Sequence, residues 1–181
     1  MLRRLSPHPA TPPAAAVAVE AEASRPAPGV LKLVYEIAGE IGDLALPLPG
    51  EPARTDELWR HTCLEAFVRV GEGPDYVEIN LAPSRAWAIY RFSGYRQGMA
   101  SPPLPPPQIR VARSEERLRL EAVVDLGGVA AGDAAWRVGL TAVIEEADGA
   151  ISYWSLAHPE GRPDFHHPDC LAIELPAPEG S

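Results

Sequence analysis

Alternation of apolar and polar residues between positions 59 and 96 is the feature that most constrains the fold of this chain. In the run YVEINL, at positions 76–81, the odd-numbered residues are apolar, whereas Glu78 and Asn80 are polar. A period of two is typical of a half-buried antiparallel strand. We therefore predict a sheet with one face on the core and one face open to a ligand. The residues predicted to face the core are Val77, Ile79 and Leu81.

The segments on either side of this strand alternate in the same way. Residues 63–70 place Glu65 and Phe67 on the outer face. After residue 81, a four-residue hairpin loop leads into the next strand, and the simplest register pairs Asn80 with Trp87. This register predicts one outer surface made of Glu65, Glu78, Asn80, Trp87 and Arg91.

Short alternating runs recur along the whole chain, and no convincing amphipathic helix interrupts them. A length of 181 residues with 46% hydrophobic residues fits one core. We therefore predict an all-β, single-domain protein, an antiparallel two-sheet β-sandwich of jelly-roll or immunoglobulin-like type. The other predicted strands are residues 16–23, 30–38, 109–113, 118–126, 136–145, 151–156 and 171–175, with a short edge strand at 44–48.

Proline marks the predicted limits of the domain. Residues 1–13 are expected to form a flexible, proline-rich N-terminus, residues 14–176 the sandwich, and residues 177–181 a C-terminal tail. The segment QGMASPPLPPPQ, at positions 97–108, is predicted to be a stiff spacer, with a lid or a partner-binding segment as alternatives.

Composition excludes several classes of partner. A formal net charge of -9 without a basic patch argues against nucleic acid. No apolar run is long enough to span a membrane, and the first residues do not resemble a signal peptide, so we expect a cytoplasmic protein. Cys63 and Cys170 have no metal-binding spacing, which favours reduced buried thiols, although a single disulfide is the alternative.

The predicted outer surface carries groups suited to a sugar ligand. An exposed Trp87 indole beside Asn80 would stack on a sugar ring while amide and carboxylate groups bind its hydroxyls. The alternative is an edge tryptophan that a loop covers. Glu65 and Glu78 would serve as an acid–base pair or, with Asn80, as calcium ligands. Equally, arginines 69, 91 or 96 would neutralise both acids across strands.

A second polar region, HPEGRPDFHHPDC, runs from His158 to Cys170. It places three histidines near Asp164 and Asp169, and the two interpretations are a metal site or a proline-braced loop whose side chains cap the backbone. A third alternative is haem, with Met99 and one of the histidines as axial ligands.

Three motifs support a family resemblance over residues 31–175. They are LW-x-H-TC-x-E-x-F, then Y-x-E-x-N-x-x-P-S-x-x-W-x-x-Y-x-F-x-G-Y-R-x-G-M, then SYWSLAHPEGRPDFHHPD. In these motifs the chain resembles bacterial DOMON-like domains, which are related to family 9 carbohydrate-binding modules. The resemblance implies a β-sandwich with a ligand surface on one sheet. Relatives in that group bind sugars, and redox relatives hold haem b.

The resemblance also implies site residues. The Glu65 strand and the Glu78-x-Asn80 strand correspond to the ligand face, and His166 lies in the terminal His-x-Pro loop. Trp59 and Trp154 match motif positions.

Together these observations predict a non-catalytic protein that binds a carbohydrate or a related polar small molecule and needs no cofactor. The alternatives are a haem-binding electron-transfer protein, an enzyme of unspecified reaction and, for the site, a calcium ion. The predicted ligand-binding residues are Glu65, Glu78, Asn80, Trp87, Arg91, Trp154, His158 and His166.

Overall fold

The computed structural model describes residues 1–130 and 132–178, and within them the regular structure is almost entirely β. Three short 3₁₀ helices occur, η1 (Ile41–Asp43), η2 (Leu58–Arg60) and η3 (Pro168–Cys170). The strands are β1 (Arg3–Arg4), β2 (Ser6–Pro7), β3 (Val17–Ala27), β4 (Val30–Gly39), β5 (Ala53–Arg54), β6 (Cys63–Val70), β7 (Tyr76–Leu81), β8 (Ala86–Phe92), β9 (Gln108–Arg113), β10 (Arg117–Asp125), β11 (Trp136–Glu145), β12 (Ile151–Ser155) and β13 (Ile173–Leu175).

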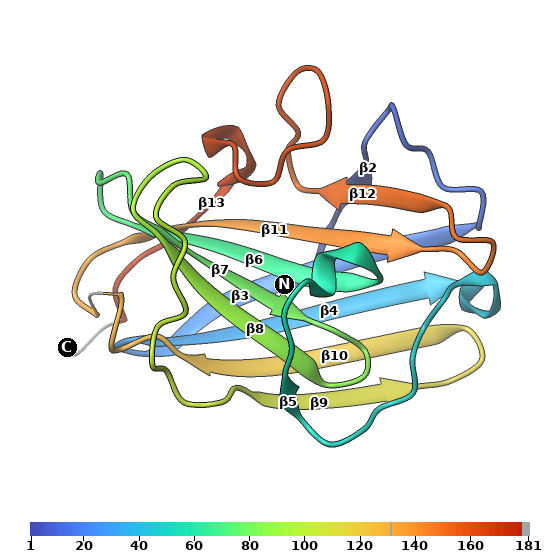
Figure 1. Cartoon of the computed structure of the whole chain (residues 1–181), viewed down its shortest axis with the longest axis horizontal. Helices are drawn as coiled ribbons and strands as arrows, with labels where there is room; N and C mark the ends of the chain where they lie inside the picture. The colour runs from blue at the N-terminus through green and yellow to red at the C-terminus, as the bar shows by residue number, and fades with distance from the viewer. Residues whose placement is uncertain (131, 179–181) are drawn as a thin grey trace.

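Two sheets form the sandwich (Figure 1). The smaller sheet has the order β1-β3-β4-β10-β9, and the larger has the order β2-β12-β11-β6-β7-β8-β5, with β13 also paired to β11. Pairing is antiparallel apart from the short parallel contact of β5 with β8. The predicted all-β, single-domain sandwich is therefore confirmed. No helix in the described part of the chain is both long and apolar enough to cross a membrane.

The central strands of the larger sheet are buried on both faces. Their inner face packs aliphatic side chains against the smaller sheet, and Val77, Ile79 and Leu81 are buried there as predicted. Their outer face carries a second buried cluster, which includes Phe67, Tyr90 and other aromatic residues. An antiparallel sheet usually leaves one face to solvent. In this protein, loops cover the second face.

The predicted register between β7 and β8 is wrong by one residue. Leu81 pairs with Trp87, and Asn80 pairs with Ala88. The hairpin loop is a tight turn that closes with a hydrogen bond from Arg85 N–H to the Ala82 carbonyl (2.9 Å), and Arg85 itself is left-handed, with φ 71°. A left-handed residue after such a turn forms a bulge that adds one residue to one strand.

The shift exchanges the two faces of β8, because neighbouring side chains of a strand point in opposite directions. Trp87, predicted to lie on the outer face, is buried in the core. Arg91 also leaves the outer face and forms an exposed ion pair with Asp75 (2.7 Å). Tyr90 and Phe92 take their places in the outer cluster.

Two other predictions differ from the structure. The N-terminal residues 1–13 are not an unpaired segment, because β1 pairs with β3, β2 pairs with β12, and Leu5 is buried in the core. The edge strand expected at 44–48 is reduced to a single bridge between Leu44 and Glu146. Part of the predicted tail, residues 179–181, lies outside the described residues.

Replacing Ile79 by Ala should lower the free energy of unfolding by about 2–5 kcal/mol, because it deletes a fully buried side chain between the sheets. Urea denaturation of the parent and the variant measures this difference. Leu48→Ala is the control, since Leu48 is 77% exposed and should change stability by less than about 0.5 kcal/mol. An Ile79→Ala cost similar to that of Leu48→Ala would contradict the described packing.

Candidate functional site

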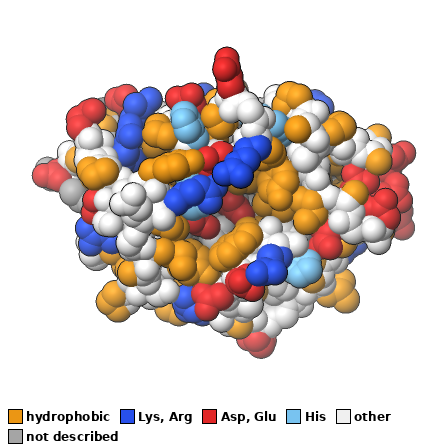
Figure 2. Space-filling view, turned by 45° about the horizontal axis from the view of Figure 1, so that its top comes forward, with side chains coloured by type: hydrophobic (Ala, Val, Ile, Leu, Met, Phe, Trp, Pro, Cys, Tyr) orange, Lys and Arg blue, Asp and Glu red, His pale blue; other side chains and the backbone are white. Residues whose placement is uncertain are grey.

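A cavity of about 440 Å³ lies on the outer face of the larger sheet, within the size range of small-molecule sites. Figure 2 shows a hollow in which acidic side chains lie deeper than the basic and hydrophobic side chains around them. The lining residues come from β6, β7, β8, β11, β12, the 3₁₀ helix η2 and two loops. They are Trp59, Glu65, Phe67, Glu78, Phe92, Arg96, Met99, Val143, Tyr153, Pro163, Asp164, Phe165 and His166.

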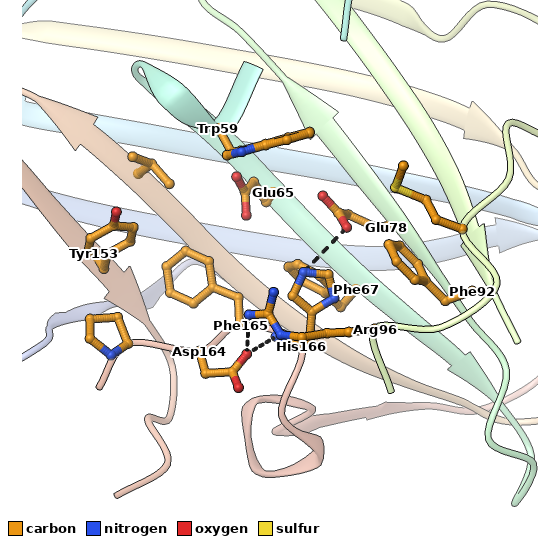
Figure 3. Close-up of a pocket in the computed structure, with 13 residues that line it drawn as sticks. Trp59, Glu65, Phe67, Glu78, Phe92, Arg96, Tyr153, Asp164, Phe165 and His166 are labelled. Carbon is orange, nitrogen blue, oxygen red and sulfur yellow. Dashed lines mark hydrogen bonds and ion pairs between the residues drawn. The ribbon is translucent and has the colours of Figure 1, made fainter. Parts of the chain in front are cut away.

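Two carboxyl groups from neighbouring strands lie in this cavity (Figure 3). Glu65 on β6 pairs with Asn80 on β7, which places Glu78 diagonally across from Glu65 on the same face. Glu78 Oε1 accepts a hydrogen bond from Asn80 Nδ2 (2.7 Å). Glu65 is 2% exposed, and its Oε1 has no hydrogen-bond partner among the described residues. A buried polar atom without a hydrogen-bond partner is unusual in a folded protein, and it marks Glu65 as a candidate ligand-binding group.

Burial favours the neutral form of both acids. Burial and the nearby Glu78 raise the pKa of Glu65 well above its ordinary value of 4.5. Burial also raises the pKa of Glu78, although the hydrogen bond from Asn80 and the charge of Arg96 oppose this shift. A protonated carboxyl both donates and accepts a hydrogen bond, so Glu65 can offer both functions to a ligand.

Trp59 forms one wall of the cavity (Figure 3). It lies opposite the histidine loop, the segment 156–172 between β12 and β13 that carries His166. It lies on the 3₁₀ helix η2, is 37% exposed, and makes an edge contact with the Tyr90 ring at a centroid distance of 6.2 Å. The Tyr90 hydroxyl in turn donates a hydrogen bond to Asp56 just before the helix (2.6 Å). The indole is therefore held at the cavity while part of its surface stays accessible.

An ion pair joins the two loops that form another wall. Arg96, in the loop after β8, contacts Asp164 in the loop after β12 (2.7 Å), and the Tyr95 hydroxyl donates to the same carboxylate. Although burial opposes the shift, these hydrogen bonds from Tyr95 and Arg96 lower the pKa of Asp164. Asp164 is therefore ionised at neutral pH, and it neutralises the arginine beside the cavity.

His166 is surrounded by aromatic rings and by the cavity acids. Its Nδ1 lies 2.7 Å from the Tyr76 hydroxyl, and its Nε2 lies 3.7 Å from Glu78 Oε2. Burial, together with the charge of Arg96, lowers the pKa of His166 to about 4. The imidazole is thus neutral at pH 7, and its contact with Glu78 is not a salt bridge under those conditions.

The structure brings together only part of the predicted site. Glu65, Glu78 and His166 line the cavity, and Asn80 is buried beside it. The residues that lie elsewhere are Trp87, Arg91, Trp154 and His158.

Each of these four residues has a local reason for its position. Trp87 and Arg91 change face because of the hairpin bulge. Trp154 on β12 points into the core, where its Nε1 donates to Ser152 Oγ (2.9 Å). His158 instead joins the N-terminal segment, with Nε2 2.8 Å from the Ser6 carbonyl oxygen. The correct assignment for these positions is therefore core or surface, not cavity.

Several lining residues were missing from the predicted site. The alternation in β6 already placed Phe67 on the outer face, and the correct β8 register would have added Phe92. Trp59 lies in one of the sequence motifs, but the sequence did not predict where its side chain would lie in the fold. Tyr153 and Phe165 meet at the cavity (ring centroids 5.8 Å apart) only because the loop after β12 folds back over the sheet. No local pattern predicts that fold-back.

Haem and calcium, the alternatives raised by the sequence, do not fit the residues present. Met99 and His166 both line the cavity, but both ring nitrogens of His166 face protein groups, Tyr76 and Glu78. For calcium, Asn80 presents its amide nitrogen to Glu78 and its oxygen to the Cys63 thiol. In the described part of the chain, no three His, Cys, Asp or Glu side chains are grouped closely enough to hold a metal.

No protein-family model and no curated protein matches the chain. Among solved structures, it is similar to one from Bacteroides uniformis described as a candidate carbohydrate-binding protein, with a TM-score of 0.66 and 13% identity over 93% of this chain and 82% of that one. It is also similar to a family 9 carbohydrate-binding module from Caldicellulosiruptor kristjanssonii, with cellotriose (TM-score 0.48, 11% identity, coverage 89% and 74%) or glucose (0.49, 11%, 91% and 78%). At such identity, the Bacteroides likeness shows a shared fold.

Proposed function

We propose that this protein binds a carbohydrate or a related polyhydroxylated small molecule in the cavity on its larger sheet, without catalysing a reaction. The observation that carries the proposal is the combination of accessible aromatic walls with two buried carboxyl groups, one of which has an oxygen without a hydrogen-bond partner in the described part of the chain. The predicted relationship to DOMON-like domains and the cytoplasmic location are part of the same proposal.

The chemistry of the cavity suits a sugar ring. The C–H face of a sugar packs on aromatic rings, and Trp59 offers an indole that is partly open to solvent. Sugar hydroxyls need both donors and acceptors, and the Glu65 and Glu78 carboxyls supply them at the base of the cavity. The description of the Bacteroides protein as a candidate carbohydrate binder supports the same class of ligand.

Replacing Trp59 by Ala should weaken sugar binding about two- to tenfold, which is the loss expected for one aromatic contact. Calorimetric or NMR titration of the parent and the variant with a panel of mono- and oligosaccharides measures the affinities. Arg91→Ala is the control, because Arg91 is exposed and lies away from the cavity. Equal weakening by both substitutions, or no binding across the panel, would count against the proposal.

Product formation should be followed in the same titrations. Two carboxyl groups in one cavity are also the groups that acid–base catalysis of glycoside hydrolysis uses. A product that the parent releases and the Glu65→Gln variant does not would show that the function is catalysis and not binding alone.

The variant Glu65→Gln should become more stable relative to the parent as the pH rises above about 4.5, the ordinary pKa of this group. Folded Glu65 holds its proton more tightly than the unfolded chain does. Its contribution to stability is therefore complete below that pH and is lost as the pH rises through the folded pKa. The difference should grow by at most about 1.4 kcal/mol per pH unit.

Urea unfolding of the parent and Glu65→Gln between pH 4 and 8 measures this difference. His166, whose pKa is lowered, affects stability in the opposite direction, but it is present in both proteins. Glu115→Gln is the matched control, since Glu115 is an exposed turn residue. A stability difference that does not change with pH would show that Glu65 is ionised in the folded protein.

A further inference from the structure

We propose that the ligand carries a positively charged amine, as an amino sugar does, and that this ammonium group binds between the carboxyls of Glu65 and Glu78. This inference rests on the proposed function and adds the charge of the ligand to it.

The first argument is the missing partner of the two acids. Glu65 and Glu78 are 2% and 5% exposed, so solvent does little for their charged forms. Glu78 has a neutral donor, Asn80, and Glu65 Oε1 has no partner among the described residues. Buried carboxylates are normally paired with a cation. An ammonium group has three donors and a full positive charge, which is what this pair lacks.

The second argument is that the protein's own cations beside the cavity are already engaged. Arg96 is held by Asp164 at 2.7 Å, and the Tyr95 hydroxyl binds the same carboxylate. His166 is neutral at pH 7 because burial lowers its pKa to about 4. Among the described ionisable groups that line the cavity, Arg96 forms its ion pair with Asp164 and acts on Glu78 only through its charge. Neither Glu65 nor Glu78 therefore forms an ion pair with a group that is charged at pH 7.

The third argument is the aromatic lining. Rings of Trp, Tyr and Phe attract cations through their electron-rich faces, and several rings around one site form the kind of cage that binds ammonium groups. Figure 3 shows the two carboxyls between the indole of Trp59 on one side and the histidine loop on the other. The rings that line the cavity are Trp59, Phe67, Phe92, Tyr153 and Phe165.

Binding of an ammonium group also changes which protonation state of the two acids is favoured. Burial and the neighbouring acid disfavour a negative charge on Glu65 in the free protein. A cation beside the carboxyl reverses that preference, because an opposite charge nearby favours the ionised form. A neutral ligand gives no such compensation, so the cavity discriminates by charge as well as by shape.

Titration with matched sugars tests the inference at constant pH and low salt. Glucose, galactose and mannose are compared with their 2-amino forms and with the N-acetylated forms, in which the amine is uncharged. Tetramethylammonium is the probe for a cation without a sugar ring. The amino forms should bind about tenfold or more tightly than both neutral partners.

Two variants separate charge from stacking. Glu65→Gln keeps the size of the side chain and should abolish most of the preference for the amino form. Trp59→Ala should weaken the amino and neutral forms, and it should reduce the charge preference less than Glu65→Gln does, since the indole adds only a cation–π attraction. Both variants are first checked for folding by urea unfolding.

The outcomes distinguish this inference from the proposed function. Neutral sugars that bind as well as their amino forms would overturn the inference and leave sugar binding standing. If tetramethylammonium binds at the cavity and no sugar does, the result supports the cation site and overturns the proposal that the ligand is a sugar. Failure of both the amino sugars and tetramethylammonium to bind would overturn the inference, whatever the neutral sugars do.

Discussion

The burial of both faces of the larger sheet is the constraint on which the rest of this structure depends. An aliphatic face that packs on a second sheet is enough for a stable sandwich, but β6, β7 and β8 also carry aromatic and acidic side chains on the opposite face. Loops must cover that face, and contacts such as Arg96 with Asp164 and Tyr76 with His166 hold them there. The cavity is the space that the loops leave over the carboxyls.

This arrangement explains why polar side chains are buried on the outer face of the larger sheet. Burial of an unpaired carboxyl is unfavourable, and an aliphatic residue at position 65 would pack without that cost. The chain instead has Glu65 beside Glu78, and the burial of both acids makes the ligand-free protein less stable. Groups of this kind, with pKa values shifted by burial and by a specific neighbour, concentrate at functional sites. The same reasoning links the unfavourable burial of these acids to the ligand binding that we propose for them.

The sequence allowed the fold class and a part of the candidate site to be predicted, for a physical reason. Side-chain alternation is a local property of an extended chain, so it placed Glu65, Phe67 and Glu78 on the outer face. It carries no information on how two strands are offset. The offset of β8 depends on the left-handed conformation of Arg85, a non-glycine residue for which the sequence gives little warning.

Other site residues depend on contacts between distant parts of the chain. Phe165 reaches the cavity through the fold-back of the loop after β12, and His158 is held away from it by the N-terminal strand segment. Trp154 is of a residue type that stacks on ligands, but its place in β12 points its side chain into the core. Alternation shows which side chains of one strand share a face, but the pairing partners decide which side chains of two strands lie together.

The bulge at Arg85 lets the hairpin tip decide which side chains of β8 line the cavity, although the tip itself does not line it. A substitution that disfavours the left-handed conformation of residue 85, at unchanged loop length, would favour the simpler register and exchange the two faces of β8. Trp87 would then enter the ligand face, while Tyr90 and Phe92 would be driven toward the core. One substitution at the hairpin tip would therefore exchange the β8 side chains that line this edge of the cavity, without a change at any lining residue.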